Sequence, residues 1–333
     1  MTRTPRRPVV TTALAAASAL ALGTGLLPAA APAPASEPRP TTVRPERLER
    51  GPDAAVPHVE GRRIVDGSAS TRVRGQQLRL LGTRPDGRYV VLVQRDGREQ
   101  VRAVTPGGGA RKIRPVYERE TATLSGDGTT LVTALHRYRR DQTLLRAYDS
   151  TTGERLGQRT SRGYRHVLDA DPATVLHAGL EGPVVAWDLA TDTGRRVSRR
   201  LGYTADLAHD RLAVFTKDPY QGGCTVVSPI SDPATTLWRS CDEVVLGFSQ
   251  DASHLATTYI LADGLGPGDV RVRTTGGELT GRYRVRAGWF PSVLFEDDDT
   301  VLLDTVTPDA SAVVRCDGGA CELASDLGPG ERF

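Results

Sequence analysis

Two groups of acidic side chains in the sequence could bind a metal ion. The first is the run Glu296-Asp297-Asp298-Asp299, and the second is the pair Asp169 and Asp171. Carboxylates packed this closely can bind calcium together with backbone oxygens. Each group, however, falls where we expect a tight turn between two strands, and acidic residues favour such turns and stay solvated there. We therefore predict turn acids, with no metal site and no bound cofactor; a calcium site is the alternative.

The motifs of two common hydrolase classes are missing from the sequence. It contains neither the Gly-x-Ser-x-Gly turn of serine hydrolases nor the His-Glu-x-x-His helix of metalloproteases. Residues 125–130, Ser-Gly-Asp-Gly-Thr-Thr, are similar to the Asp-box of sialidases, but Leu131 stands where that motif has Trp. We predict no catalytic residue; a triad assembled from different repeats is the alternative. The six histidines share no spacing: His58, His136, His166, His177, His209 and His254.

Basic and aromatic residues give little indication of a ligand. The densest basic patch is Arg137, Arg139 and Arg140, with Tyr138 between them. We interpret it as a solvated loop, with contact to an anionic polymer as the alternative. Three Trp, nine Tyr and five Phe residues are few for a sugar-binding surface.

A repeated turn sets the elements that must position these residues. The stretch 124–134, Leu-Ser-Gly-Asp-Gly-Thr-Thr-Leu-Val-Thr-Ala, has an apolar end, an Asp-Gly turn and an alternating apolar run. It predicts two antiparallel strands, because Asp and Gly tolerate the positive φ that tight turns need. The same pattern recurs at residues 80–93 and, in weaker form, further along the chain. The markers of the turn are Asp86 with Gly87, Asp127 with Gly128, Asp171, Asp210, Asp251 and Asp298.

The spacing of these markers indicates the architecture. Successive marker Asp residues lie 41, 44, 39, 41 and 47 residues apart. A period of about 40–45 residues with several strands per unit is the signature of a β-propeller blade. Helical periodicity is missing after the N-terminal apolar run. We predict an all-β β-propeller with six four-stranded repeats, or seven blades if a hairpin at residues 62–75 belongs to a further unit.

Two strand ends carry a family resemblance. The third strands of two units end in Trp187-Asp188 and Tyr148-Asp149, and turns that end in Gly194 and Gly153 follow them. Over residues 80–327 the chain resembles WD40-type propellers and, more broadly, the TolB-like propellers of bacterial export compartments. It departs from eukaryotic WD40 repeats, since the Gly-His dipeptide is missing and a single unit has Trp-Asp. With its Arg bias it is similar to a secreted actinobacterial WD40-like protein, which implies an architecture but no partner.

The four cysteines predict two disulfides. In an exported chain an even number of cysteines indicates disulfide bonds, with three possible connectivities. Cys316 and Cys321 flank a Gly-Gly hairpin turn, while Cys224 and Cys241 lie in one unit, at the start of its third strand and the end of its fourth. We predict the pairs Cys224–Cys241 and Cys316–Cys321. The alternative is a zinc site, but two cysteines separated by four residues, without a neighbouring His, make a poor tetrahedral set.

The first 35 residues have the layout of a secretory signal peptide. Three arginines precede an apolar run over residues 9–27, and Ala33-Pro34-Ala35 offers small residues for cleavage before Ser36. An uncleaved membrane anchor and a twin-arginine export signal are the alternatives. No later segment is apolar enough to cross a membrane. We predict a secreted or cell-envelope-associated protein.

The composition changes again after the predicted cleavage site. Residues 36–55 are rich in Pro, Arg and Glu and have few large apolar side chains, so burial cannot offset the entropy of ordering them. We predict a disordered linker at residues 36–55 and a β-propeller domain at residues 56–333.

The charge balance excludes one class of partner. Residues 1–35 hold three of the 43 basic residues and none of the 40 acidic ones, so the remaining chain is neutral. A neutral chain has no overall field that would attract nucleic acid. We predict a monomeric binding or interaction scaffold for an unknown protein or cell-envelope ligand. The alternative is an extracellular hydrolase or lyase that uses carboxylates at the mouth of the propeller channel.

Overall fold

The protein is all-β, as predicted. The computed structural model describes residues 39–95, 97–116, 120–180 and 182–331, so the predicted signal peptide and the predicted cleavage site lie outside the described residues. Helix in these ranges is limited to three short 3-10 turns, at Pro45–Arg47, Tyr138–Arg140 and Pro219–Gln221. No helix in the described part is long and apolar enough to cross a membrane.

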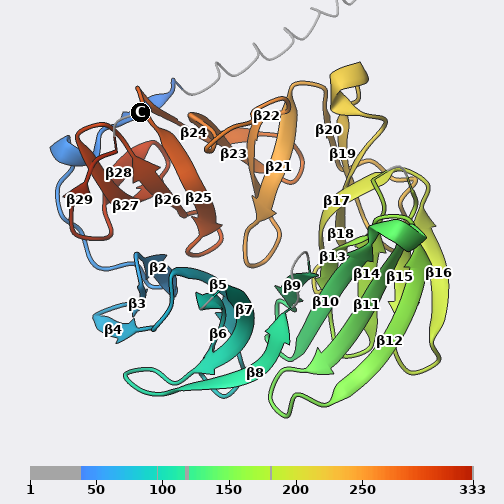
Figure 1. Ribbon diagram of the computed structural model, residues 1–333. Coiled ribbons are helices and arrows are strands. Elements are labelled where there is room, and N and C mark those ends of the chain that lie inside the picture. Colours follow the sequence, from blue (N-terminus) through green and yellow to red (C-terminus); the bar gives the residue numbers. More distant parts are fainter. Residues whose placement is uncertain (1–38, 96, 117–119, 181, 332–333) are drawn as a thin grey trace, which may run out of the picture. The chain divides into compact units, whose positions relative to one another are not determined.

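Seven sheets follow one another along the chain (Figure 1). The first has three strands: β2 (His58–Glu60), β3 (Arg63–Asp66) and β4 (Ala69–Arg72). The second and third are β5 (Gln77–Thr83), β6 (Tyr89–Arg95), β7 (Arg98–Val104) and β8 (Ala110–Val116), then β9 (Glu120–Leu124), β10 (Thr130–Arg137), β11 (Gln142–Asp149) and β12 (Arg155–Arg162). The fourth and fifth are β13 (His166–Ala170), β14 (Thr174–Ala178), β15 (Val184–Asp188) and β16 (Thr193–Ser198), then β17 (Leu201–Asp206), β18 (Arg211–Phe215), β19 (Thr225–Ser228) and β20 (Trp238–Ser240). The last two are β21 (Glu243–Phe248), β22 (His254–Tyr259), β23 (Asp269–Thr274) and β24 (Leu279–Val285), then β25 (Trp289–Phe295), β26 (Val301–Val306), β27 (Ala310–Asp317) and β28 (Ala320–Leu323).

These sheets are the blades of a seven-bladed β-propeller. Within each blade successive strands pair antiparallel. The first strands of the six larger blades are the inner strands, and each contacts the next: β5 with β9, β9 with β13, β13 with β17, β17 with β21, and β21 with β25. The six predicted four-stranded repeats are confirmed, and the predicted hairpin at residues 62–75 belongs to a seventh blade.

Every marker Asp lies in the turn between the first and second strands of its blade: Asp86, Asp127, Asp171, Asp210, Asp251 and Asp298. In the Ser-Gly-Asp-Gly turn, the Asp127 carboxylate accepts hydrogen bonds from the Ser125 hydroxyl (2.5 Å) and the Thr129 N–H (3.0 Å). Gly128 has a φ of 73°, and its N–H donates to the Ser125 carbonyl (2.9 Å). The Asp side chain therefore closes the turn internally, which is a structural role.

The first blade lacks an inner strand. We call the end of the propeller that carries the Asp turns the turn face, and the opposite end, where one blade is linked to the next, the link face. The β2–β3 turn at Gly61 lies on the link face, in one hollow with Gln77 and Glu120, which begin the inner strands β5 and β9. The β3–β4 turn lies on the turn face, where Asp66 accepts a hydrogen bond from the Tyr89 hydroxyl (2.8 Å). β2, β3 and β4 therefore correspond to the second, third and fourth strands of the other blades, and no described residue supplies a first strand.

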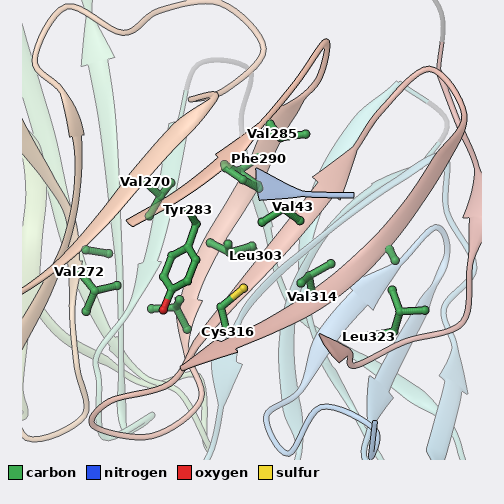
Figure 2. Packing of buried hydrophobic residues seen from close by; sticks show 13 residues of the cluster. Val43, Val270, Val272, Tyr283, Val285, Phe290, Leu303, Val314, Cys316 and Leu323 are labelled. Atoms are coloured by element: carbon green, nitrogen blue, oxygen red, sulfur yellow. The ribbon is translucent and has the colours of Figure 1, made fainter. Parts of the chain in front are cut away.

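Residues 39–55 do not behave as the linker predicted for residues 36–55. β1 (Thr41–Val43) pairs in parallel with β24, the outer strand of the sixth blade. Val43 is 1% exposed, and Figure 2 shows it among Phe290, Tyr283 and Leu303. Further along, the Gly51 N–H donates to the Leu323 carbonyl of the seventh blade (2.9 Å). The prediction was wrong for this part because a free strand edge supplies the backbone partners and a few apolar side chains, Val43, Leu48 and Ala54, supply the apolar contacts.

Trp187, from the Trp-Asp dipeptide, is a core residue. It lies one residue before the end of β15, the third strand of the fourth blade, and is fully buried between the third and fourth blades. Its indole N–H donates to Asp192 (2.8 Å). The cysteines are paired as predicted, Cys224 with Cys241 and Cys316 with Cys321, at S–S distances of 2.01 and 2.09 Å. Both bonds lie within single blades, so they fasten outer strands and do not join the ends of the propeller.

Candidate functional site

A cavity of about 440 Å³ occupies the place of the missing inner strand. We call it the seam. Its walls are β2 of the first blade, the inner strand β5 of the second blade, and β25, β26 and β27 of the seventh blade. Three blades therefore meet at the seam, whereas elsewhere an inner strand fills this position. Its volume falls in the range of about 300–1,000 Å³ that is typical of ligand sites.

The seventh blade presents a partly covered sheet face to the seam: Leu302 and Val313 are buried against Ala54 and Val56, while Leu294 is open. Ser292, Leu294, Leu302, Asp304 and Val313 line the cavity. Ser292 and Val313 are both register partners of Asp304, and Leu294 is the partner of Leu302, so these side chains share one face of the sheet. Between the third and fourth blades the equivalent face packs against the inner strand β13. Here Leu294 stays 43% exposed.

β2 presents an unpaired backbone edge to the same cavity. It pairs with β3 alone, in the register His58–Val65, Val59–Ile64 and Glu60–Arg63. Because a two-residue turn joins β2 to β3, Glu60 and Arg63 form the hydrogen-bonded pair that closes the hairpin. Hydrogen-bonded and non-hydrogen-bonded pairs alternate along an antiparallel ladder, so the next pair, Val59–Ile64, is not hydrogen-bonded. The N–H and C=O of Val59 therefore point away from β3, toward the free edge. A row of unpaired backbone groups is a template for another strand.

The ionisable residues that line the seam are His58, Arg79 and Asp304, and the charges of Glu60 and Glu331 act on Asp304. Burial raises the pKa of the Asp304 carboxyl; His58 lowers this pKa, while Glu60 and Glu331 raise it. The His58 ring is buried between the Val56 carbonyl (3.2 Å from Nδ1) and the Glu60 carboxylate (3.1 Å from Nε2). Within the described part of the chain, no hydrogen bond to the Asp304 carboxylate is formed. This half-buried carboxylate is therefore suited to a cationic group brought by a ligand.

A second hollow, of about 720 Å³, lies on the turn face across the third to sixth blades. Its walls carry Asp127, Asp169, Asp171, Asp206 and His209. Asp171 accepts hydrogen bonds from the backbone of its own turn, and Asp206 is 3.0 Å from His209 Nδ1. Asp169 accepts from the N–H of Leu207 (2.7 Å) and of Ala170 (2.8 Å). Asp171 is thus engaged in its own turn, as predicted. The prediction was wrong for Asp169, which lies in strand β13 and is held by the Leu207 N–H of the next blade instead of staying solvated in a turn.

Asp169 differs from its neighbours in its ionisation. Burial, aided by the charges of Asp206 and Asp171, raises its pKa from 3.8 to about 6, although the N–H donors of Leu207 and Ala170 lower it. A raised carboxyl pKa destabilises the folded chain once the group ionises. Asp169 should therefore reduce stability as pH rises from 4 to above 6, by about 2–3 kcal/mol.

Asp169→Asn should remove this penalty. At pH 7.5 the variant is expected to be more stable than wild type by about 2 kcal/mol, and at pH 4 the two should be equal, because wild-type Asp169 is then protonated. Urea denaturation at both pH values measures the difference. Asp188→Asn is the matched control, with the opposite sign at pH 7.5, because the Thr191 N–H and hydroxyl hold the pKa of Asp188 below its usual range. A gain from Asp169→Asn that is the same at both pH values would contradict the assignment.

The acidic run at residues 296–299 is divided among structural contacts. Glu296 pairs with Arg315 (2.7 Å), which holds the pKa of the Glu296 carboxyl below its usual range. Asp297 caps its own turn through the N–H of Thr300 (2.8 Å), and Asp298 accepts from the Asp251 N–H of the neighbouring blade (3.0 Å). In the described ranges no group of three or more His, Cys, Asp or Glu side chains could hold a metal ion. The run therefore serves the structure of the seventh blade, and Asp298 connects this blade to the sixth.

The histidines do not form a catalytic triad in the parts of the chain described. His254 Nδ1 lies 2.9 Å from the Ser253 hydroxyl and 3.3 Å from Asp299. Both contacts use the same ring nitrogen, whereas a triad needs Ser and carboxylate on opposite nitrogens. His177 is 2% exposed, and burial lowers its pKa to about 3. Neither of its ring nitrogens has a hydrogen-bond partner, so His177 is a neutral core residue.

The basic patch lies on the link face, at the end of β10, where Arg137 is the last strand residue, and in the 3-10 turn that leads to β11. Arg139 and Arg140 are exposed and Arg137 is half-buried. Tyr138 is 62% exposed, and its ring contacts His136 edge-on (4.4 Å between centroids). The patch is therefore a solvated turn, as predicted.

The residues of the seam were not predicted from the sequence. His58, Val59 and Asp304 have no motif, because they come from blades that are distant in the sequence. One signal was present: the hairpin at residues 62–75 is about half the length of the other units. A unit that is one strand short predicts an open position in the ring, provided that its missing strand is the inner one.

Comparison with known structures shows the fold. The β-propeller domain of the trilobed protease from Pyrococcus furiosus, which has an open velcro topology, matches with a TM-score of 0.59 and 11% identity over 79% of this chain and 89% of that domain. The acylaminoacyl peptidase of Pyrococcus horikoshii matches with a TM-score of 0.58 and 13% identity; the alignment covers 79% of this chain but 48% of the peptidase, so this chain spans about half its length. The Cps50 (Swd1) propeller domain of Myceliophteria thermophila has a TM-score of 0.53 and 12% identity, over 78% and 88%.

These likenesses carry no function by themselves. WD40 domains and a TolB protein also match, at TM-scores of 0.43 to 0.46. No protein-family profile matches the chain, and no curated protein is similar to it. At identities this low, similarity shows the propeller architecture alone.

Proposed function

We propose that this chain is an exported β-propeller scaffold that binds a protein or cell-envelope ligand through the seam. The seam carries this proposal, because it combines an apolar cavity, an unpaired strand edge and a half-buried carboxylate. The two cysteine pairs support an oxidising compartment outside the cytoplasm. A binding scaffold needs no catalytic residues, and most of the acidic side chains on the turn face are engaged in local structure.

Capture from the native host tests the scaffold function. Residues 39–333, oxidised and immobilised, are incubated with the culture medium and the cell-wall fraction, and retained macromolecules are identified by mass spectrometry. We expect a specific protein or wall polymer that a Leu294→Arg variant retains less well, because Leu294 is the exposed apolar residue of the seam. Retention of small molecules alone, or of nothing, would contradict a scaffold function.

Acid–base chemistry on the turn face is the second candidate function. Asp169, with its pKa raised to about 6, lines one hollow with the Asp206–His209 pair. A carboxyl that titrates near neutrality beside a His and a second acid is a candidate acid or base for a hydrolase or lyase. Release of reducing ends or free amino groups from the wall fraction by wild type, but not by Asp169→Asn, would support this function over the scaffold.

A further inference from the structure

We propose that an extended segment of a partner protein completes the first blade as its inner strand. The inference rests on the proposed scaffold function and specifies the ligand's chemistry. The segment pairs antiparallel with β2, has apolar side chains on both faces, and carries one Arg or Lys that faces Asp304.

Backbone geometry fixes how this segment binds. The outward N–H and C=O of Val59 are the groups that an antiparallel neighbour would use. Every larger blade has such a neighbour on the inner side of its second strand. An added strand would therefore restore the pattern of the other six blades, and this mode of recognition obtains affinity from the main chain and specificity from alternate side chains.

The walls of the seam specify the side chains. On one side an inner strand would face Leu294 of the seventh blade, next to the apolar surface that Ala54 and Val56 form over Leu302 and Val313. On the other side it would face Leu78 and Leu80 of β5. Both faces of the segment must therefore be apolar, as in strands that are buried on both sides.

The charge of Asp304 determines where the bound segment carries its basic residue. The carboxylate of Asp304 faces the cavity with Glu60 and Glu331 nearby. Two basic groups are close, but both are engaged: His58 contacts Glu60, and the Arg79 guanidinium donates to the Ala122 carbonyl (3.3 Å). A basic residue of the segment is the complement that this site lacks.

The inner strand β5 provides a probe with this chemistry. A labelled peptide that copies Gln77–Thr83, Gln-Leu-Arg-Leu-Leu-Gly-Thr, has Leu residues on one face and an Arg with a Leu on the other. Its matched control has Glu in place of the Arg. Fluorescence anisotropy should show the Arg peptide binding wild type at least ten-fold more tightly than the Glu peptide.

Three variants locate the peptide in the seam. Val59→Pro removes the outward N–H and leaves the β3 ladder intact, and should weaken binding at least ten-fold. Leu294→Arg should do the same without a backbone change, which keeps the test valid if Val59→Pro fails to fold. Asp304→Asn should abolish the preference for Arg over Glu. Tyr220→Ala, at a 72% exposed position outside the seam, should bind as wild type does.

Three results would overturn the proposal. They are absence of peptide binding to wild type at millimolar concentration, equal binding by wild type and both seam variants, and a dimer in sedimentation whose seam is filled by a second copy. The scaffold function fails on a different result, when the host fractions yield small molecules alone or nothing. If wild type and Leu294→Arg capture the same partner from these fractions, the chain is a scaffold that binds elsewhere.

Discussion

Gly128→Ala is expected to destabilise the folded chain by about 3–5 kcal/mol. Two effects add. Gly128 has a φ of 73°, and a left-handed conformation costs a residue with a Cβ about 1–2 kcal/mol. A Cβ here would also overlap the carbonyl oxygen of Thr83, the last residue of β5, and crowd the Cα of Arg84 in the turn that follows, both in the preceding blade. Backbone atoms cannot rotate away, so the two blades must separate.

Gly87→Ala separates these two effects. Gly87 follows Asp86 in the equivalent turn and has a φ of 77°, but a Cβ at this position meets no atom within 4 Å. It should therefore cost about 1–2 kcal/mol, from the conformation alone. Chemical denaturation of both variants measures the difference. Equal losses would show that the Asp-Gly turn of the third blade is not packed against the second.

Removal of residues 39–50 should be the second large effect, a loss of about 3 kcal/mol or more. A chain that begins at Gly51 lacks β1 and its three residue pairs with β24, and it leaves the site of the buried Val43 empty. The contact of Leu48 with the same cluster is lost as well. Thermal unfolding of this chain should start at a lower temperature than that of wild type.

The control is a chain that begins at Arg39, which keeps β1 complete. It should unfold as the longer chain does, because the exposed Arg39 and Pro40 precede the strand. If both truncated chains were equally stable, residues 41–50 would be the linker that their composition predicts, and β1 would contribute nothing.

The sequence predicted most of the propeller because its information is local. Asp127 and Gly128 define a turn by their own conformational preferences. Because that turn occurs once in each of the larger blades, the number of its repeats gives the number of these blades. Cys316 and Cys321 oppose each other across one hairpin, so their pairing also follows from neighbouring residues. Such features need no knowledge of distant contacts.

What the sequence did not predict depends on edges and on contacts between blades. Val43 has no periodic pattern around it; it is buried because β24 offers a free edge. Asp304 is one acid within an apolar strand, and its importance appears once the first blade is seen to lack an inner strand. Composition describes how a segment behaves alone. It cannot show that another part of the fold offers an unpaired strand edge with which the segment can pair.

Amide hydrogen exchange at Val59 tests most directly whether the first blade has an open edge. In the free chain the Val59 N–H should exchange rapidly, while the N–H of Glu60, in the closing pair with Arg63, should be protected. Saturation with the Arg peptide should then slow exchange at Val59 and leave Glu60 unchanged. A Val59 amide that is already protected in the free chain, or one whose exchange does not change on saturation, would contradict this account.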